Sequence, residues 1–132
     1  MTNREKEEHN KKFIMKYFTI NTSEVTEEDI RKFTNNEVYI QSILTVRRSF
    51  PDYTIMMEDI TAEDDFVITH SVARGTHSAE FYGIPATFKT VEFQIIIKYQ
   101  IVNDIIVNAW PMYDSLILME QLGVLNEPIK GA

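Results

Sequence analysis

VEFQIIIKYQIVNDIIVNAW, residues 91–110, is the stretch that decides the fold. Hydrophobic side chains occupy every odd position from Val91 to Ile101, and glutamate, glutamine or lysine occupies most of the even positions between them. A period of two is typical of a strand with one dry face and one wet face, and Ile96 is the apolar exception on the wet face. Asn103-Asp104 is a tight-turn dipeptide, so we expect the chain to return as an antiparallel strand over residues 105–110.

Two more strands are predicted upstream of this hairpin. After Pro51 the hydrophobic period changes from about 3.6 to about 2, and Tyr53, Ile55 and Met57 then occupy alternate positions. The acidic turn at residues 63–65 separates this strand from a second one over residues 66–74. The strand region is therefore expected to form a meander of antiparallel strands.

Helical patterns come first in the chain and once more at its end. Each of them begins at a threonine, asparagine or aspartate whose side chain can accept a hydrogen bond from the first helical turn. The expected helices cover residues 3–20 after Thr2, a short segment after Thr26, the segment from Asn36 to Phe50, and residues 115–122 between Asp114 and Gly123. Helices followed by antiparallel strands predict an α+β fold, with the helices packed on one face of a curved sheet.

Composition narrows the possible functions. The 132 residues fit a single domain spanning residues 1–132, and 44% hydrophobic with 25% charged residues is the balance of a soluble folded protein. The chain has no cysteine, which excludes disulfides, thiolate metal sites and cysteine nucleophiles. A net charge of -7 argues against nucleic-acid binding. With no apolar stretch long enough for a membrane span and no secretory signal, we expect a cytoplasmic protein.

Several segments carry a resemblance to one family. RGTHSAEFYGIPAT (74–87), residues 91–110 and DSLILMEQLGV (114–124) follow one another as in the SnoaL-like polyketide cyclases, and SFPDYTIMMEDITAEDDFV (49–67) is similar as well. The resemblance implies the cone-shaped α+β barrel of the nuclear transport factor 2-like superfamily. It implies an aldol-type ring closure inside an apolar cone, carried out by an aspartate without metal or cofactor. It also implies a homodimer that pairs through the outer sheet face, where Ile96 lies.

At the positions where the resemblance implies the family's proton-transferring residues, this chain has hydrocarbon side chains. The catalytic aspartate falls on Pro111 and the pocket histidine on Ile97, and neither side chain here can move a proton. Asp114 and His77 are the remaining candidates for catalysis. Asp114 can equally be the N-cap of the last helix, and His77 can equally be a structural residue beside a bend. His70 and His77 are separated by an odd number of residues and would point to opposite faces of one strand, so no metal site is expected.

A ligand pocket is expected inside the cone. Its candidate lining residues are those on the dry face of the long strand together with neighbours on the adjacent strands: Trp110, Phe93, Ile95, Ile97, Tyr99, Ser71 and Met112. Two functions remain open from the sequence. The first is binding of a small hydrophobic or polycyclic molecule, with cofactor-free acid/base catalysis of the cyclase or isomerase type. The second is a non-catalytic ligand-binding or structural dimer module.

Overall fold

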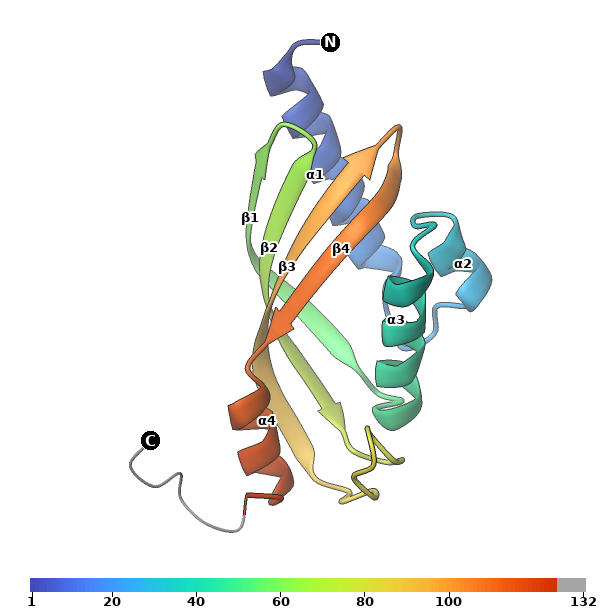
Figure 1. Cartoon of the computed structure of the whole chain (residues 1–132), viewed down its shortest axis with the longest axis vertical. Coiled ribbons are helices and arrows are strands. Elements are labelled where there is room, and N and C mark those ends of the chain that lie inside the picture. The colour runs from blue at the N-terminus through green and yellow to red at the C-terminus, as the bar shows by residue number, and fades with distance from the viewer. Residues whose placement is uncertain (126–132) are drawn as a thin grey trace.

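The computed structural model describes residues 1–125 of the chain, and Figure 1 shows their arrangement. The α+β fold expected from the sequence is confirmed, because the helices pack against a four-stranded antiparallel sheet. The elements in chain order are α1 (Asn3–Ile20), α2 (Glu27–Arg31), α3 (Glu37–Ser49), β1 (Thr54–Glu63), β2 (Phe66–Thr76), β3 (Thr90–Val102), β4 (Ile105–Tyr113) and α4 (Ser115–Leu122). Among the described residues, no helix has the length and apolarity to cross a membrane.

The sheet follows the chain order β1-β2-β3-β4, with every neighbouring pair antiparallel. Along β3 the odd-numbered residues face inward, and Ile97, Tyr99 and Ile101 are buried there. The turn between β3 and β4 is made by Asn103 and Asp104, whose φ angles of 50° and 59° are both left-handed. Two successive left-handed residues match the twist of an antiparallel hairpin, so the predicted Asn-Asp turn is confirmed.

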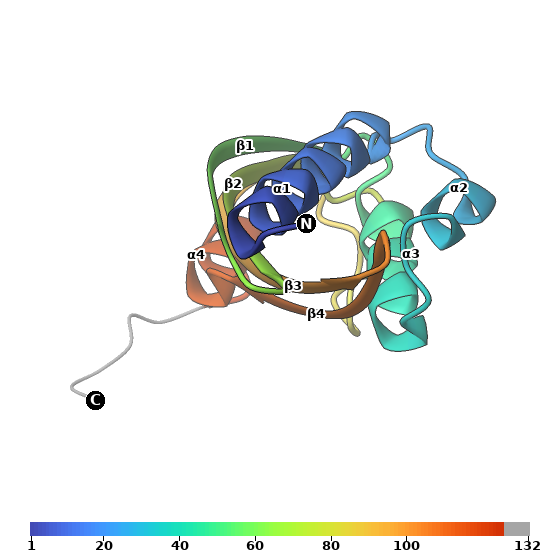
Figure 2. The same ribbon diagram turned by 90° about the horizontal axis from the view of Figure 1, so that it is seen from above.

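The sheet curves strongly around the helices. Figure 2, which views the molecule from above, shows the strands wrapping around one side while α1 and α3 cover the opening. The register shifts between Met57 and Asp59 in β1, and again at Gln100/Ile101 in the β3–β4 pair. Such bulges bend a strand and increase its twist, which is how a sheet of this length closes into a cone.

The helix ends are set by the side chains predicted to cap them. Thr2 accepts a hydrogen bond from the Glu5 amide, and Thr26 forms a reciprocal capping box with Asp29. The remaining two helices start in the same way, at Asn36 and Asp114. Each cap satisfies an amide that the helix itself leaves unpaired, which fixes the first turn.

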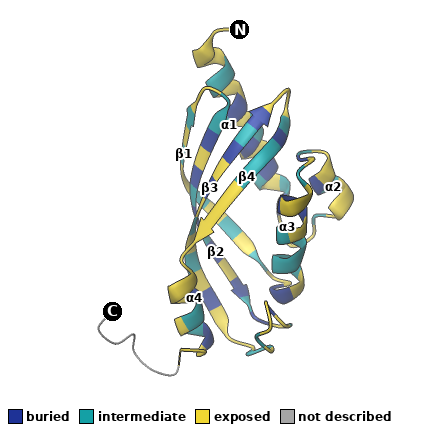
Figure 3. Ribbon diagram, in the orientation of Figure 1, coloured by how far each residue is buried: buried dark blue, intermediate teal, exposed yellow. Residues whose placement is uncertain are grey.

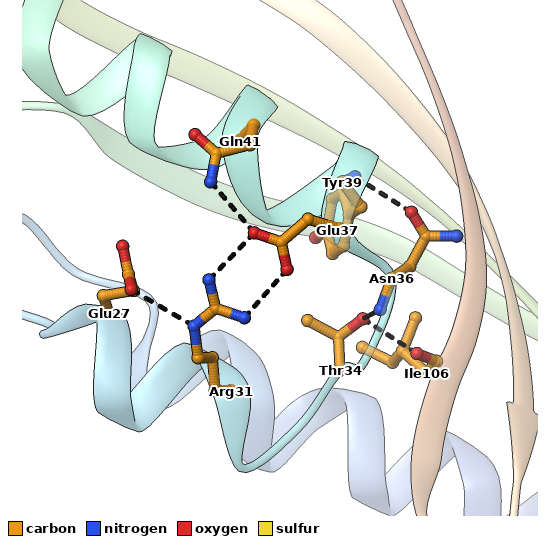
Figure 4. A network of polar contacts seen from close by, with 8 residues as sticks. All are labelled: Glu27, Arg31, Thr34, Asn36, Glu37, Tyr39, Gln41 and Ile106. Atoms are coloured by element: carbon orange, nitrogen blue, oxygen red, sulfur yellow. Dashed lines mark hydrogen bonds and ion pairs between the residues drawn. The ribbon is translucent and has the colours of Figure 1, made fainter.

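A polar network joins α2, α3 and the β3–β4 hairpin (Figure 4). Arg31 in α2 donates to both oxygens of Glu37 in α3 at 2.9 Å, and its Nε donates to Glu27 at 3.2 Å. The Thr34 hydroxyl between the helices donates to the Ile106 carbonyl of β4 at 2.8 Å. The start of α3 is therefore held against β4.

The core has two parts. Figure 3 colours the buried residues dark blue along the ribbon. The larger one surrounds the fully buried Tyr17 and Tyr99 and joins α1 to the sheet. The smaller one surrounds Phe50 and Phe81 and joins the end of α3 to α4. Val46 and Tyr53 border the smaller cluster, Ile43 borders the larger one, and the candidate site lies among them.

Candidate functional site

A cavity of about 110 Å³ lies between α3 and the inner face of the sheet. Helix α3 forms one wall, and β1, β3 and β4 form the opposite wall. The lining residues are Tyr39, Ser42, Ile43, Val46 and Arg47 from α3, Ile55, Ile95, Ile97, Pro111 and Tyr113 from the strands, and Asn21, Tyr53, Phe81 and Tyr82 from the connections. The walls are mostly hydrocarbon or aromatic, as in small-molecule sites generally.

Pro111 and Ile97 face each other across the β3–β4 pair and both line this cavity. They are the two positions at which the resemblance places proton-transferring residues. The positions therefore do open into a cavity, but here both carry side chains without an ionisable group. The lining contains no aspartate, glutamate or histidine among the described residues.

Arg47 supplies the charged group of the lining. Its guanidinium donates to the Thr22 carbonyl and to the Asn21 side chain. Its Nε is buried and has no hydrogen-bond partner within residues 1–125. Burial lowers the pKa of Arg47 from its usual value, yet an arginine stays protonated in proteins. The cavity is thus an apolar space with one cation at its edge.

Tyrosine hydroxyls provide further polar groups, beside the Asn21 and Ser42 side chains. Tyr39 and Tyr53 line the cavity, and the Tyr39 hydroxyl hydrogen-bonds that of Tyr17 at 2.8 Å. Burial raises the pKa of Tyr39 and Tyr53 above the usual value for a phenol, and raises the pKa of Tyr17 to about 12. These phenols are therefore protonated at neutral pH and can act as hydrogen-bond donors, but they are poor bases.

The predicted pocket residues fall into three groups. Ile95 and Ile97 line the cavity, as their place on the dry face of β3 indicates. Phe93 lines a smaller adjoining cavity of about 40 Å³. Tyr99 and Ser71 are fully buried on the inner face of the sheet but do not belong to the lining of either cavity.

Trp110 and Met112 lie on the outer face of the sheet, so their expected place in the pocket is wrong. Trp110 pairs with Lys98 and Met112 with Ile96, and their exposed fractions are 47% and 74%. The cause is the bulge in β4. Without a bulge, the register set by the Ile101–Ile106 pair would place Trp110 opposite Ile97. The extra residue Val107 shifts the register by one, so Pro111 lies opposite Ile97 instead. A slip of one residue exchanges the two faces of a strand, which brings Pro111 inside and puts Trp110 outside.

The two candidate catalytic residues lie outside the cavity. Asp114 is exposed, and its carboxylate accepts a hydrogen bond from the Ile117 amide at 3.1 Å, which is the N-cap geometry. His77 is fully buried beside Phe50, with their ring centroids 5.5 Å apart. Its Nδ1 accepts the Thr87 amide at 3.2 Å, so the ring proton of the neutral imidazole is on Nε2.

The sequence signatures meet at one end of the sheet as structural contacts. His77 of Gly-Thr-His binds Thr87 of Ile-Pro-Ala-Thr, and Asp52 accepts hydrogen bonds from both the amide and the hydroxyl of Thr76 at 2.7 Å. Gly75 leaves room for Phe50, whose Cβ would lie 3.0 Å from an added Cβ. These contacts hold the connection between β2 and β3, whose residues Phe81 and Tyr82 line the cavity.

Sequence reasoning missed Arg47 and the tyrosines of the lining. A signal was present for Arg47, because it follows Ile43 and Tyr39 at intervals of four residues and so lies on the same side of the helix. Tyr53 and Tyr113 carried no comparable signal, since each lies at a chain connection or strand end whose direction depends on the folded structure.

The comparisons with known proteins agree with this fold. A family model described as SnoaL-like polyketide cyclase matches residues 5–122, and the chain belongs to this family. AclR from Streptomyces galilaeus, a proposed hydroxylase, superposes with a TM-score of 0.78 at 18% identity, over 98% of this chain and 87% of AclR. A SnoaL-like protein from Jannaschia sp. CCS1 gives a TM-score of 0.78 at 17% identity, over 92% of this chain and 95% of that protein.

IdmH from Streptomyces antibioticus, a proposed polyketide cyclase, is more similar in sequence over a shorter length. It is 34% identical over 66% of this chain and 63% of its own, with a TM-score of 0.56. No curated protein matches the chain.

Proposed function

We propose that this chain binds a small hydrophobic ring compound in the cavity between α3 and the sheet. The observation that carries the proposal is the cavity itself, which combines apolar walls from Ile43, Ile55 and Ile97 with a few donors at one side. Apolar concavity with a few oriented polar groups is the usual character of a small-molecule site.

The size of the cavity limits the ligand. An engineered apolar cavity of about 150 Å³ binds benzene, whereas drug-sized ligands occupy roughly 300–1,000 Å³. The 110 Å³ here is smaller than that cavity, so it suits a single small ring. A polycyclic ligand would require Tyr82 or Tyr113, both exposed lining residues, to move away from α3.

The lining favours binding without acid/base catalysis by a carboxylate or an imidazole. A general base must reach the proton it removes, and Pro111 and Ile97 occupy the two positions where the family resemblance suggests such groups. Cofactor-free catalysis is the second candidate function. It is favoured by Arg47 and the protonated Tyr53, which can polarise a carbonyl oxygen, but it requires a base from water or from the substrate.

A second copy of this chain is the partner we propose for the outer sheet face. Ile68, Ile96, Trp110 and Met112 lie there as exposed apolar side chains on three adjoining strands. Exposed apolar side chains gathered on one face, here around Lys98, are typical of an association surface.

Binding of toluene, a neutral compound with a single ring, tests the proposed function. We expect amide resonances of cavity residues to shift saturably in a ¹H–¹⁵N NMR titration, and Ile97→Phe to abolish the shifts by filling the cavity. The neighbouring Ile96→Phe is the matched control, because it points to the opposite face of β3 and should leave binding unchanged. Shifts confined to the outer face, or binding that survives Ile97→Phe in a folded variant, would contradict the proposal.

A further inference from the structure

Arg47 is a partly buried cation whose charge meets only neutral acceptors. Its guanidinium nitrogens bind a backbone carbonyl, that of Thr22, and the side-chain amide oxygen of Asn21. No carboxylate lies within ion-pair distance of it among residues 1–125. By contrast, Arg31 has two glutamate partners. Arg47 is thus uncompensated in a chain that carries 20 acidic and 13 basic residues.

The Nε of Arg47 adds an unused donor at the same place. It is buried and has no partner within the described residues. A buried donor without a partner and a desolvated charge without a counter-ion both cost free energy, so proteins normally satisfy them. The phenols around Arg47, Tyr17, Tyr39 and Tyr53, remain protonated and do not neutralise it. An incoming anionic group at the guanidinium would supply the missing counter-charge.

We infer that the ligand of the proposed cavity carries a carboxylate, which binds Arg47 while its ring lies against Ile43, Ile97 and Pro111. This inference rests on the proposed function, and it adds the chemical class of the ligand. A planar guanidinium matches a carboxylate through two parallel hydrogen bonds, which a neutral amide cannot reproduce. The remaining walls are apolar and accommodate the ring.

The larger groove elsewhere on the molecule lacks this selectivity. It measures about 630 Å³ and lies where α1, α2 and the β3–β4 hairpin meet. Lys16 and Lys32 line it together with Glu24, Asp29 and Asp104, so acids accompany both cations. An anionic ring compound has no reason to prefer it over the site at Arg47.

Benzoate and benzamide provide the test, because they share shape and differ in charge. We expect benzoate to bind the wild-type protein about tenfold more tightly than benzamide in NMR titrations, since charge-assisted hydrogen bonds are about twice as strong as neutral ones. The shifted resonances should be those of the cavity. Arg47→Gln should reduce benzoate affinity about tenfold, to the level of benzamide. Arg48→Gln, which removes the exposed neighbouring arginine, should leave both affinities unchanged.

The outcomes separate the two proposals. If benzamide binds as tightly as benzoate, or if Arg48→Gln weakens benzoate as much as Arg47→Gln does, the carboxylate inference is overturned while the cavity function stands. If toluene, benzoate and benzamide all fail to shift cavity resonances, the proposed function itself is overturned. Should Arg47→Gln not fold, Arg47→Lys retains the charge but not the fork and should bind benzoate with intermediate affinity. The wild-type comparison of the two probes needs no variant.

Discussion

Gly75 shows how a single residue sets the end of the cone. A Cβ at this position would lie 3.0 Å from the Cβ of Phe50 and 3.5 Å from a carboxylate oxygen of Asp52. A glycine inside a strand is typical of a bulge or a close backbone approach, and at Gly75 the structure shows the close approach. Phe50 in turn stacks on His77, so the absence of one side chain permits a contact that anchors the connection between β2 and β3.

Gly75→Ala should destabilise the protein by about 1–3 kcal/mol, because Phe50 is packed through its Cβ and cannot rotate away from the added methyl group. Chemical denaturation would measure the loss. Arg74→Ala, an exposed substitution one residue earlier in β2, is the control and should change stability by less than about 0.5 kcal/mol. Equal stability of Gly75→Ala and wild type would show that this close approach is absent.

Asp114 acts as a helix cap at the residue scale. Asp114→Ala should therefore destabilise the protein by about 0.5–2 kcal/mol, whereas Asp114→Asn, which retains the accepting oxygen, should be nearly neutral. Neither change should alter toluene affinity, because Asp114 does not line the cavity. Loss of toluene binding or of a measured turnover in Asp114→Asn, with stability unchanged, would instead point to a functional role for this carboxylate.

At the scale of elements, features that depend on neighbouring residues in the chain were predicted better than features that depend on how strands pair. The caps at Thr2, Thr26, Asn36 and Asp114 and the alternation of β3 depend on neighbouring residues, and the structure confirms them. The bulge at Val107 depends on how β4 fits against β3 in the curved sheet, which no local pattern reports. One extra residue was enough to exchange Trp110 and Pro111 between the outer and inner faces. The fold class was therefore predictable, but the choice of β4 residues that line the cavity was not.

The link between α2 and α3 should make their contact sensitive to acid. Arg31 holds the pKa of the Glu37 carboxyl at about 2, below its ordinary value of 4.5. A depressed pKa means that the pair contributes its full stabilisation above about pH 4.5 and loses it as the pH falls through about 2. The contribution is small because both side chains are exposed and screened by salt.

Glu37→Gln should accordingly lower the melting temperature at neutral pH, and the difference from wild type should disappear near pH 2. Glu28→Gln, an exposed position in α2, is the control, because Glu28 takes no part in the network of Figure 4. A difference that persists unchanged to pH 2 would mean that Glu37 acts through something other than its charge.

At the scale of the whole molecule, the two faces of the sheet differ in how far their apolar side chains are buried. The inner face carries the cavity and the buried core, while the outer face presents Ile96, Trp110 and Met112 to solvent. The Lys98 Nζ lies 4.5 Å from the centre of the Phe66 ring and 5.5 Å from that of Trp110, so these exposed side chains contact one another across the outer face. Trp110 is therefore suited to report association between copies and not ligand binding in the cone.

We predict a homodimer through this outer face. Light scattering should give twice the chain mass of 15.4 kDa, and Ile96→Glu should return the protein to the monomer by placing charge in the contact. Val38→Glu, at an exposed apolar position on α3 and not on the outer sheet face, is a control for added charge. A monomeric wild type at micromolar concentration would overturn the proposed dimer while leaving the cavity proposal intact.

The most direct measurement is a crystal structure of the protein under xenon pressure, because xenon enters apolar cavities that are empty and accessible whatever their natural ligand. The account predicts a xenon peak between α3 and the sheet, in contact with Ile43, Ile55 and Ile97. Xenon bound only on the outer face, or a space filled by the side chains around it, would contradict the claim that this family member keeps a binding cavity inside its cone.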